Sequence, residues 1–279
     1  MSTDGASLSL SVNDKFTLVE ARYNDDNKGG IEYEMKKAGV TRIDVLHITS
    51  WDEDHCNAKE LRTLLSVLKP KKVEYPSYLP HTDNGKESKK LIEDYTEGTT
   101  VSITPLMVNN CVKNRLQGSD VFYNPIVNNP DPEKANDNSV AKIFREGSYQ
   151  VLSLGDCEDE TISKRLCNEE IVQKEVDILI LAHHGSTNSV VTPEFLDDVK
   201  PSFVICPVDR DNRFEHPDQE VRGWLNSRNI PYLTTKDGDV VVRTKDSHAY
   251  QVFQVKDRWI EQECSPLTGK TYYPNDIYE

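Results

Sequence analysis

Apolar positions in the first third of the chain predict a pair of strands, followed by strands that alternate with helices. Leu61, Leu64, Leu65 and Leu68 recur at helical spacing, and Pro70 ends that helix because proline cannot continue the hydrogen-bond ladder. The elements predicted here are strands at 8–12 and 16–22, a helix at 31–37, a strand at 43–48, a helix at 59–68 and a strand at 71–75. We expect the last of these strands to be parallel to its neighbour.

The middle of the chain is polar, and regular patterns return only after it. Residues 76–98 are predicted to be rich in loops, a strand is predicted over 99–106, and 109–133 show the low periodicity of functional or mobile loops. The elements predicted beyond are strands at 139–144 and 149–154, a helix at 158–168, a strand at 177–181, a helix at 193–200, a strand at 203–207, a helix at 219–228 and strands at 232–234 and 240–243. This order favours an α/β fold of two mixed sheets packed face to face, with helices outside.

The length and composition favour a folded protein with one domain. The 279 residues are 36% hydrophobic and 29% charged, which excludes a disordered or fibrous chain. We predict one domain over 1–260 and an irregular C-terminal tail over 261–279. No apolar run approaches the roughly 18 residues of a membrane span. Residues 1–11 lack the basic and apolar segments of a secretory signal, so a cytoplasmic protein without membrane contact is predicted.

The six cysteines and the charge balance narrow the functional classes. No two cysteines form a CxxC pair, so reduced thiols are predicted and zinc-finger spacing is absent. The formal net charge of −14 disfavours tight nonspecific binding to duplex nucleic acid. A nuclease is still compatible with this balance, because bound metal ions supply local positive charge.

Three predicted strands end in carboxylate or imidazole side chains, which is the pattern of a metal site. Residues 52–55 (Asp-Glu-Asp-His) follow the first of these strands, Asp156 follows the second, and His183 and His184 follow the third. Aspartate oxygen and neutral imidazole nitrogen suit Zn²⁺, Mn²⁺ or Fe²⁺. Two ions about 3.5–4 Å apart could bind a phosphoryl or acyl oxygen and turn a bridging water into a nucleophile. The sequence therefore predicts a metal-dependent hydrolase, with Asp156 as a bridging carboxylate.

The order of these motifs resembles the metallo-β-lactamase superfamily, and in particular the hydrolase domain at the C-terminus of the competence protein ComEC. The segments that carry the resemblance are Asp-x-Asp-His at 52–55, Asn-Ser-Val at 138–140, Gly-Asp at 155–156, His-His-Gly-Ser at 183–186, Asn-Arg-Phe-x-His-Pro at 212–217 and Thr-x-x-Gly-x-Val at 235–240. The similarity covers residues 41–68 and 138–243.

The resemblance implies a four-layered αββα sandwich with the site at one edge, in a family that includes phosphodiesterases, nucleases and phosphocholine esterases. It implies that one or two divalent ions, Zn²⁺ or Mn²⁺, are held by Asp52, Asp54, His55, Asp156 and His183. His183 stands nearer the strand end than His184, although one sequence does not separate the two histidines. Catalysis is expected to involve Asp54, His184 and His216, with His216 as a proton donor to the leaving group or a transition-state contact.

The chain departs from the pattern of the superfamily in three features, one of which is that Cys56-Asn57-Ala58 replaces the small residues that usually follow the histidine. The superfamily pattern is His-x-Asp-x-Asp-His, and Ser50 stands at its first position, where the pattern has a histidine. A hydroxyl group is a poor neutral ligand for a metal ion. Occupancy of one metal position is therefore predicted to be weakened, and Ser50→His is expected to raise the metal content if the position is a vacated ligand site. The glycine-rich opening hairpin of the superfamily is not recognisable in residues 8–22.

Two functions remain open from the sequence. The first is hydrolysis of a nucleotide or nucleic-acid phosphodiester, and the net acidity favours small nucleotides, cyclic nucleotides or single-stranded ends. The second is a binding or scaffold module with little or no catalysis, whose protein partner would contact the middle loops or the tyrosine-rich tail at 272–278. We also expect His47 to be a hydrogen-bonded core residue and Trp51 to be a packing residue beside the site.

Overall fold

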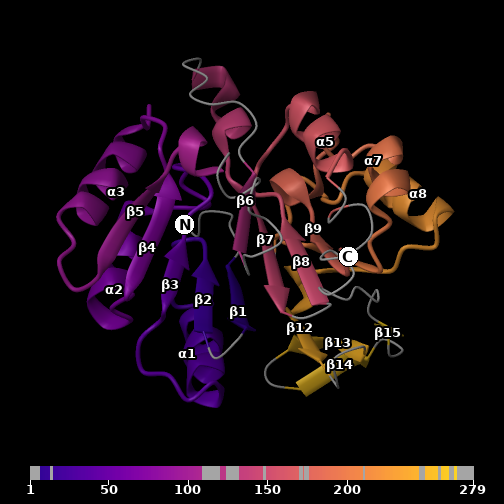
Figure 1. Ribbon diagram of the computed structural model, residues 1–279. Helices are drawn as coiled ribbons and strands as arrows, with labels where there is room; N and C mark the ends of the chain where they lie inside the picture. Colours follow the sequence, from indigo (N-terminus) through magenta and orange to yellow (C-terminus); the bar gives the residue numbers. More distant parts are fainter. Residues whose placement is uncertain are drawn as a thin grey trace, which may run out of the picture. The chain divides into compact units, whose positions relative to one another are not determined.

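Two units make up the computed structural model of the chain, and each contains its own large sheet (Figure 1). The first unit comprises Met1–Met107 and Val127–Val140, and the second comprises Val108–Ile126 and Ala141–Glu279. The structure describes residues 7–12, 15–108, 120–123, 132–146, 149–169, 172, 176–209, 211–244, 249–256, 259–263 and 267–268. Of the predicted partner segments, residues 109–119, 124–131 and the tail at 272–278 lie outside these described residues.

The first unit is a five-stranded sheet in the order β1-β2-β3-β4-β5, in which β1 and β2 form an antiparallel hairpin and β2 to β5 are parallel. Its elements are β1 (Leu8–Val12), β2 (Lys15–Val19), α1 (Lys28–Lys37), β3 (Val45–His47), α2 (Ala58–Val67), β4 (Lys72–Pro76), α3 (Asp83–Glu93), β5 (Thr99–Ile103) and the 3₁₀ segment η1 (Pro132–Asn138). The predicted hairpin and the parallel pairing of β3 with β4 are confirmed.

Helix α2 fixes the end of the loop that carries the candidate aspartate and histidine ligands. The Asn57 side chain accepts hydrogen bonds from the backbone N–H groups of Lys59 and Glu60. Such an N-cap stabilises a helix by about 1 kcal/mol. Leu61 and Leu64 are fully buried in the core of the unit, as their helical spacing predicts. The loop before the helix therefore ends at a defined point against the sheet.

The prediction of loop structure over 76–98 is wrong where α3 forms. This helix begins after Thr82, whose hydroxyl accepts a hydrogen bond from the Gly85 backbone N–H. Its buried residues are Gly85, Ser88 and Ile92, of which only isoleucine is a large apolar side chain. A helix that buries so little apolar surface leaves almost no periodic signal in the sequence, so only its packing in the tertiary structure reveals it.

The second unit contains a six-stranded sheet in the order β11-β10-β9-β8-β7-β6, in which β8 to β11 are parallel and β6 and β7 are antiparallel. Its elements up to β11 are β6 (Asp120–Tyr123), β7 (Ala141–Glu146), β8 (Tyr149–Ser153), α5 (Glu160–Cys167), β9 (Ile178–Ile180), η2 (Ala182–Gly185), α7 (Pro193–Val199), β10 (Phe203–Cys206), α8 (Gln219–Ser227) and β11 (Tyr232–Thr234).

The helices of the second unit cover one face of this sheet. Leu152, Leu179 and Val204 are neighbours across β8, β9 and β10, so their side chains lie on the same face. They belong to one buried cluster with Phe195 of α7 and Leu225 of α8. Figure 1 shows α5, α7 and α8 lined up along this sheet. The apolar strand predicted around β9 is therefore buried as expected.

A third, antiparallel sheet follows in the second unit, with strand order β12-β13-β14, and β15 pairs with β13. It comprises η3 (Thr235–Asp237), β12 (Asp239–Thr244), β13 (Ala249–Lys256), β14 (Trp259–Glu263) and β15 (Leu267–Thr268). Only β12 was expected from the sequence. The predicted boundary between the domain and the tail, at residues 260 and 261, falls inside β14, and the extent of the domain stays a prediction.

The predicted α/β class is confirmed, because the large sheet of each unit is mixed and carries helices. These are the elements that a four-layered αββα sandwich of the metallo-β-lactamase type requires. None of the helices in the described part of the chain has the length and apolar character that crossing a bilayer demands.

Candidate metal centre

The loop between β3 and α2 presents the first pair of candidate ligands, Asp54 and His55. The carbonyl oxygen of Asp52 accepts hydrogen bonds from the backbone N–H groups of His55, at 3.0 Å, and Cys56, at 2.7 Å. This closes a tight turn directly before the helix. The Nε2 atom of His55 lies 3.9 Å from Oδ1 of Asp54, and both residues offer atoms suited to hold a metal ion.

The imidazole of His55 is oriented by a buried carboxylate that sequence reasoning did not identify. Its Nδ1 lies 3.1 Å from Oε1 of Glu20 and 3.2 Å from the hydroxyl of Thr49. The same carboxylate accepts hydrogen bonds from the Thr49 hydroxyl, at 2.6 Å, and the Thr49 backbone N–H, at 3.2 Å. With Nδ1–H donating to Glu20, the lone pair of neutral His55 is on Nε2, the side of Asp54.

A second buried group ties this loop to the start of α2. Arg22 is only 1% exposed, and its guanidinium binds the carboxylate of Glu60 through two hydrogen bonds of 2.9 and 3.1 Å. A third nitrogen donates to the backbone carbonyl of Glu53, at 3.1 Å. Because the planar guanidinium satisfies both partners at once, the ion pair holds the loop in one conformation.

Ser50 lies in a buried hydrogen-bonded cluster with Tyr78. The Ser50 hydroxyl donates to Oδ2 of Asp52, at 3.0 Å, and lies 3.1 Å from the Tyr78 hydroxyl. The Tyr78 hydroxyl also accepts the Trp51 backbone N–H, at 3.0 Å. Burial and the nearby negative charge of Asp52 raise the pKa of Tyr78 well above its ordinary value. The phenol therefore stays protonated and acts as a hydrogen-bond donor.

Two structural predictions for this region are confirmed. His47 is fully buried, and its Nδ1 lies 3.1 Å from Oε2 of Glu74, so it is a hydrogen-bonded core histidine. Trp51 is 2% exposed, and its ring packs against the ring of Tyr75 with centroids 5.7 Å apart. Both side chains are therefore buried within the first unit.

In the second unit, the turns after β8 and β9 bring Asp156 and His184 together. The His183 backbone N–H donates to the carbonyl of Gly155, at 3.0 Å, which joins the two turns. The Nε2 atom of His184 lies 4.0 Å from Oδ1 of Asp156. Its Nδ1 lies 2.7 Å from the carbonyl oxygen of Pro207, so Nδ1–H donates there and Nε2 carries the lone pair.

His183 points to a different partner. Its Nδ1 is hydrogen-bonded to the carboxylate of Glu158, and 32% of the His183 side chain is exposed. The structure thus brings His184 beside Asp156 and pairs His183 with the loop before α5. The resemblance implied His183 as the ligand, whereas the geometry within this unit favours His184.

The His-His-Gly turn has a strained backbone. His183, His184 and Gly185 have φ values of 44°, 55° and 84°, three consecutive residues in the left-handed region. A β-carbon at Gly185 would lie 2.8 Å from Cβ of Pro217 and 2.9 Å from Sγ of Cys206. Two non-glycine residues in this region cost about 1–3 kcal/mol each, and such strain clusters at functional sites. With the backbone in this left-handed conformation, the imidazole of His184 faces Asp156.

The loop that carries His216 is joined to the same turn through Asp218. Nδ1 of His216 lies 2.9 Å from Oδ1 of Asp218. The other carboxylate oxygen accepts the Thr187 backbone N–H, at 2.8 Å, and the Asp218 N–H donates to the Gly185 carbonyl, at 3.0 Å. Burial alone would raise the pKa of Asp218, but the hydrogen bonds from Thr187 and His216 outweigh it and lower the pKa. The ionised carboxylate therefore orients His216.

Three residues of these clusters were missed in the sequence, namely Glu20, Tyr78 and Asp218. Asp218 did leave a signal, since it is an acidic residue two positions from a candidate histidine, whereas Glu20 lies inside the strand predicted over 16–22. Tyr78 left none, because it lies 28 residues from Ser50 in a segment that looks like loop.

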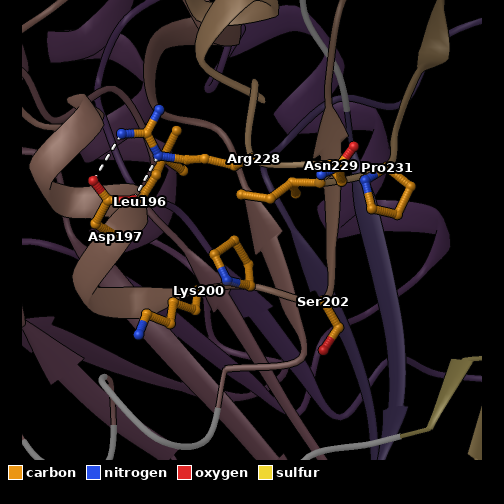
Figure 2. A pocket seen from close by; sticks show the side chains of 9 residues that line it. Leu196, Asp197, Lys200, Ser202, Arg228, Asn229 and Pro231 are labelled. Atoms are coloured by element: carbon orange, nitrogen blue, oxygen red, sulfur yellow. Dashed lines mark hydrogen bonds and ion pairs between the residues drawn. The ribbon is translucent and has the colours of Figure 1, made fainter. Parts of the chain in front are cut away.

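A pocket in the second unit lies at the amino ends of β10 and β11, opposite to the strand ends that the candidate ligands follow (Figure 2). It is lined by residues from the ends of α7 and α8 and from the segments before β10 and β11, among them Lys200, Ser202 and Asn229. The dashed lines in Figure 2 mark the Asp197–Arg228 ion pair at its rim, with two hydrogen bonds of 2.8 Å. The candidate ligands instead follow the carboxyl ends of β8 and β9, where α/β sheets usually bind ligands.

Comparison with known proteins agrees with the resemblance seen in the motifs. No family model matches the chain. Over 210 residues it is 27% identical to ComE operon protein 3 of Bacillus subtilis strain 168, and the alignment covers 75% of this chain. The chain is similar to ComE operon protein 3. This confirms the predicted resemblance to ComEC. The aligned part is 25% of ComE operon protein 3, so the chain spans about a quarter of that relative.

One solved structure found in the comparison comes from Parabacteroides distasonis ATCC 8503, and its protein is provisionally named a metal-dependent hydrolase. It shares 14% sequence identity with this chain and superposes with a TM-score of 0.47, over 82% of this chain and 89% of that one.

Proposed function

We propose that this chain is a metal-dependent hydrolase, and that Asp54, His55, Asp156 and His184 bind a divalent cation, Zn²⁺ or Mn²⁺. The observation that carries the proposal is the same in two pairs of residues, Asp54 with His55 and Asp156 with His184. In each pair, Nδ1 of the histidine is taken up by a protein acceptor, and Nε2 faces an aspartate oxygen at 3.9 or 4.0 Å. That is the orientation of metal-binding histidines, whose second nitrogen is held by a hydrogen bond.

The donor set suits such an ion. Two carboxylates and two neutral imidazoles offer oxygen and nitrogen atoms of the kind that Zn²⁺ and Mn²⁺ prefer. That both pairs bind the same ion is part of the proposal, and the motif order shared with the metallo-β-lactamase superfamily supports it. His184 takes the ligand role in this proposal because His183 is hydrogen-bonded to Glu158.

We propose a phosphodiester as the substrate. A divalent ion at such a site polarises a phosphoryl group and lowers the pKa of water. We propose His216 as the proton donor to the leaving oxygen, and its Nδ1 lies 2.9 Å from the Asp218 carboxylate, which orients the ring. The net charge of −14 favours a nucleotide, a cyclic nucleotide or a single-stranded end over long duplex DNA.

The test measures metal content first and rate second. Protein purified without chelator is analysed for metal and then assayed on an activated phosphodiester with added Mn²⁺ or Zn²⁺. We expect about one equivalent or more of metal and a rate that Asp54→Asn combined with His55→Asn abolishes. His81→Asn is the matched control, because His81 is exposed in the same unit. Substoichiometric metal, together with a rate no higher than that of the double variant, would refute the proposal.

The two neighbouring histidines give a second, independent test. His184→Asn is expected to lose the metal, whereas His183→Asn keeps it, because only His184 faces Asp156. The reverse result would return the ligand role to His183.

A binding or scaffold module with little catalysis is the second candidate. The cluster of Ser50 and Tyr78 favours it, because neutral hydroxyls occupy the position where the superfamily pattern has a histidine. Full metal content without turnover on nucleotide, oligonucleotide or ester substrates is the result that this second function predicts.

A further inference from the structure

The buried cluster around residue 50 bears on how many ions the chain binds. We infer that the hydroxyl groups of Ser50 and Tyr78 fill the place of a second metal position, so that the chain binds a single divalent ion. This inference rests on the proposed metal-dependent function. Its residues all belong to the first unit.

The Ser50 hydroxyl has no bonding capacity left for a cation. It donates its one proton to Oδ2 of Asp52, at 3.0 Å. It accepts from the Asp52 backbone N–H, at 3.2 Å, and lies 3.1 Å from the Tyr78 hydroxyl, which donates to it. One donor and two lone pairs are the whole inventory of a hydroxyl group. A cation at Ser50 would have to displace one of these bonds.

The Tyr78 side chain cannot move aside without breaking further contacts. Its hydroxyl accepts the Trp51 backbone N–H, at 3.0 Å, and its backbone carbonyl accepts the Trp51 indole N–H, at 2.9 Å. The two rings pack edge to face with centroids 6.5 Å apart, and both side chains are at most 5% exposed. A swing of the phenol would leave the buried Trp51 N–H unsatisfied, which is unfavourable.

The chemistry of the cluster also disfavours an ion. Zn²⁺ and Mn²⁺ are bound in proteins by imidazole, thiolate and carboxylate groups, and Ser50 and Tyr78 offer only neutral hydroxyls. The carboxylate of Asp52 is engaged by Ser50. Asp54 and His55, in contrast, form the oriented pair described above, so the first unit supplies ligands for one ion.

The cluster changes the result expected for Ser50→His. Ser50 is fully buried, and an imidazole at this position would meet the Tyr78 hydroxyl that now lies 3.1 Å from Oγ. The single substitution should therefore not add a metal ion. Removing the phenol at the same time, as in Ser50→His combined with Tyr78→Ala, opens the position and supplies an imidazole ligand.

The experiment counts bound Mn²⁺ per chain by native mass spectrometry and by calorimetric titration. We expect one ion for the wild-type chain, one for Ser50→His, and two for the double variant. Tyr78→Phe serves as the control for folding, because it keeps the ring packed on Trp51, and it should melt cooperatively with one ion bound.

Two results would overturn the inference: two ions in the wild-type chain, or no second ion in a double variant that melts cooperatively. A wild-type chain that binds no ion at all would instead refute the proposed function. The two failures are therefore distinguishable in the same titration.

Discussion

The two histidines of the proposed metal site are held in place by different physical means. In the first unit, His55 follows an unstrained turn, and the negative charge of Glu20 fixes its orientation. In the second unit, His184 lies in a left-handed turn and donates to the neutral carbonyl of Pro207. A carboxylate partner makes imidazole a stronger base, whereas a main-chain carbonyl mainly orients it.

This difference indicates where each half of the site is vulnerable. The His55 half depends on buried charges, so substitutions that remove a charge should weaken it. The His184 half depends on backbone conformation, so substitutions that restrict φ or fill space should weaken it. Each prediction below tests one side of this contrast, in order of decreasing expected effect.

The largest effect is expected for Arg22→Ala in the first unit. Removal of the guanidinium leaves the Glu60 carboxylate without its buried partner and frees the loop at Glu53. The free energy of unfolding should fall by about 3–5 kcal/mol. The control is Arg62→Ala, in α2 like Glu60. It breaks an exposed ion pair with Glu87, and it should change the stability by less than about 1 kcal/mol. Urea denaturation measures both, and equal effects would contradict the assigned role of Arg22.

The next effect is expected for Gly185→Ala in the second unit. The added β-carbon would meet Pro217 and Cys206 within 3 Å, at a φ of 84°. Strain and overpacking together should lower the stability by about 2–4 kcal/mol and disturb metal binding at His184. Gly223→Ala, in α8, meets nothing within 4 Å and should stabilise the chain by about 0.5–1 kcal/mol. Thermal melts of the two variants should therefore shift in opposite directions.

A smaller effect is expected for Glu20→Gln. The amide keeps the shape of the side chain and removes the charge that orients His55, so metal affinity should fall by about 10-fold with little loss of stability. Titration with Mn²⁺ measures the affinity. Glu87→Gln, which alters only an exposed ion pair, should leave the affinity unchanged. An unchanged metal affinity in Glu20→Gln would show that the charge of Glu20 does not orient His55, and His55 and His184 would then not differ in the way proposed here.

The smallest effect is expected for Asp218→Asn. The pKa of Asp218 is lowered in the folded chain, so its stabilising contribution is present above its unfolded pKa and is lost as the pH falls through the folded pKa. The wild-type chain should be more stable than the variant by up to about 1 kcal/mol at pH 7. The difference should shrink as the pH falls below 3.8, the ordinary pKa of an aspartate, and vanish once the carboxylate of the folded chain is protonated. Denaturation at a series of acidic pH values measures the difference, and a difference that grows in acid would contradict the prediction.

Elements with a strong apolar pattern were predictable from the sequence, and elements without one were not. The α2 helix buries leucines at helical spacing, and β9 is an apolar run, so both were found. The α3 helix buries only one large apolar side chain, and it was missed. Local patterns report how much apolar surface an element buries, so an element that buries little is invisible to them.

For the candidate site, the sequence determined which residue types stand at the ends of β3, β8 and β9, because a ligand motif is short and local. Only the tertiary structure decided that His184 faces Asp156 and that His183 does not, because two adjacent left-handed residues set these directions.

The tertiary structure also decided the surroundings of the motif. The sequence showed that Ser50 replaces a histidine, and the fold showed that Tyr78, distant in sequence, closes that position with hydrogen bonds. The physical reason is general. Residue identity fixes which atoms can donate, accept or bind a metal, while their directions and partners depend on contacts between segments far apart in the chain.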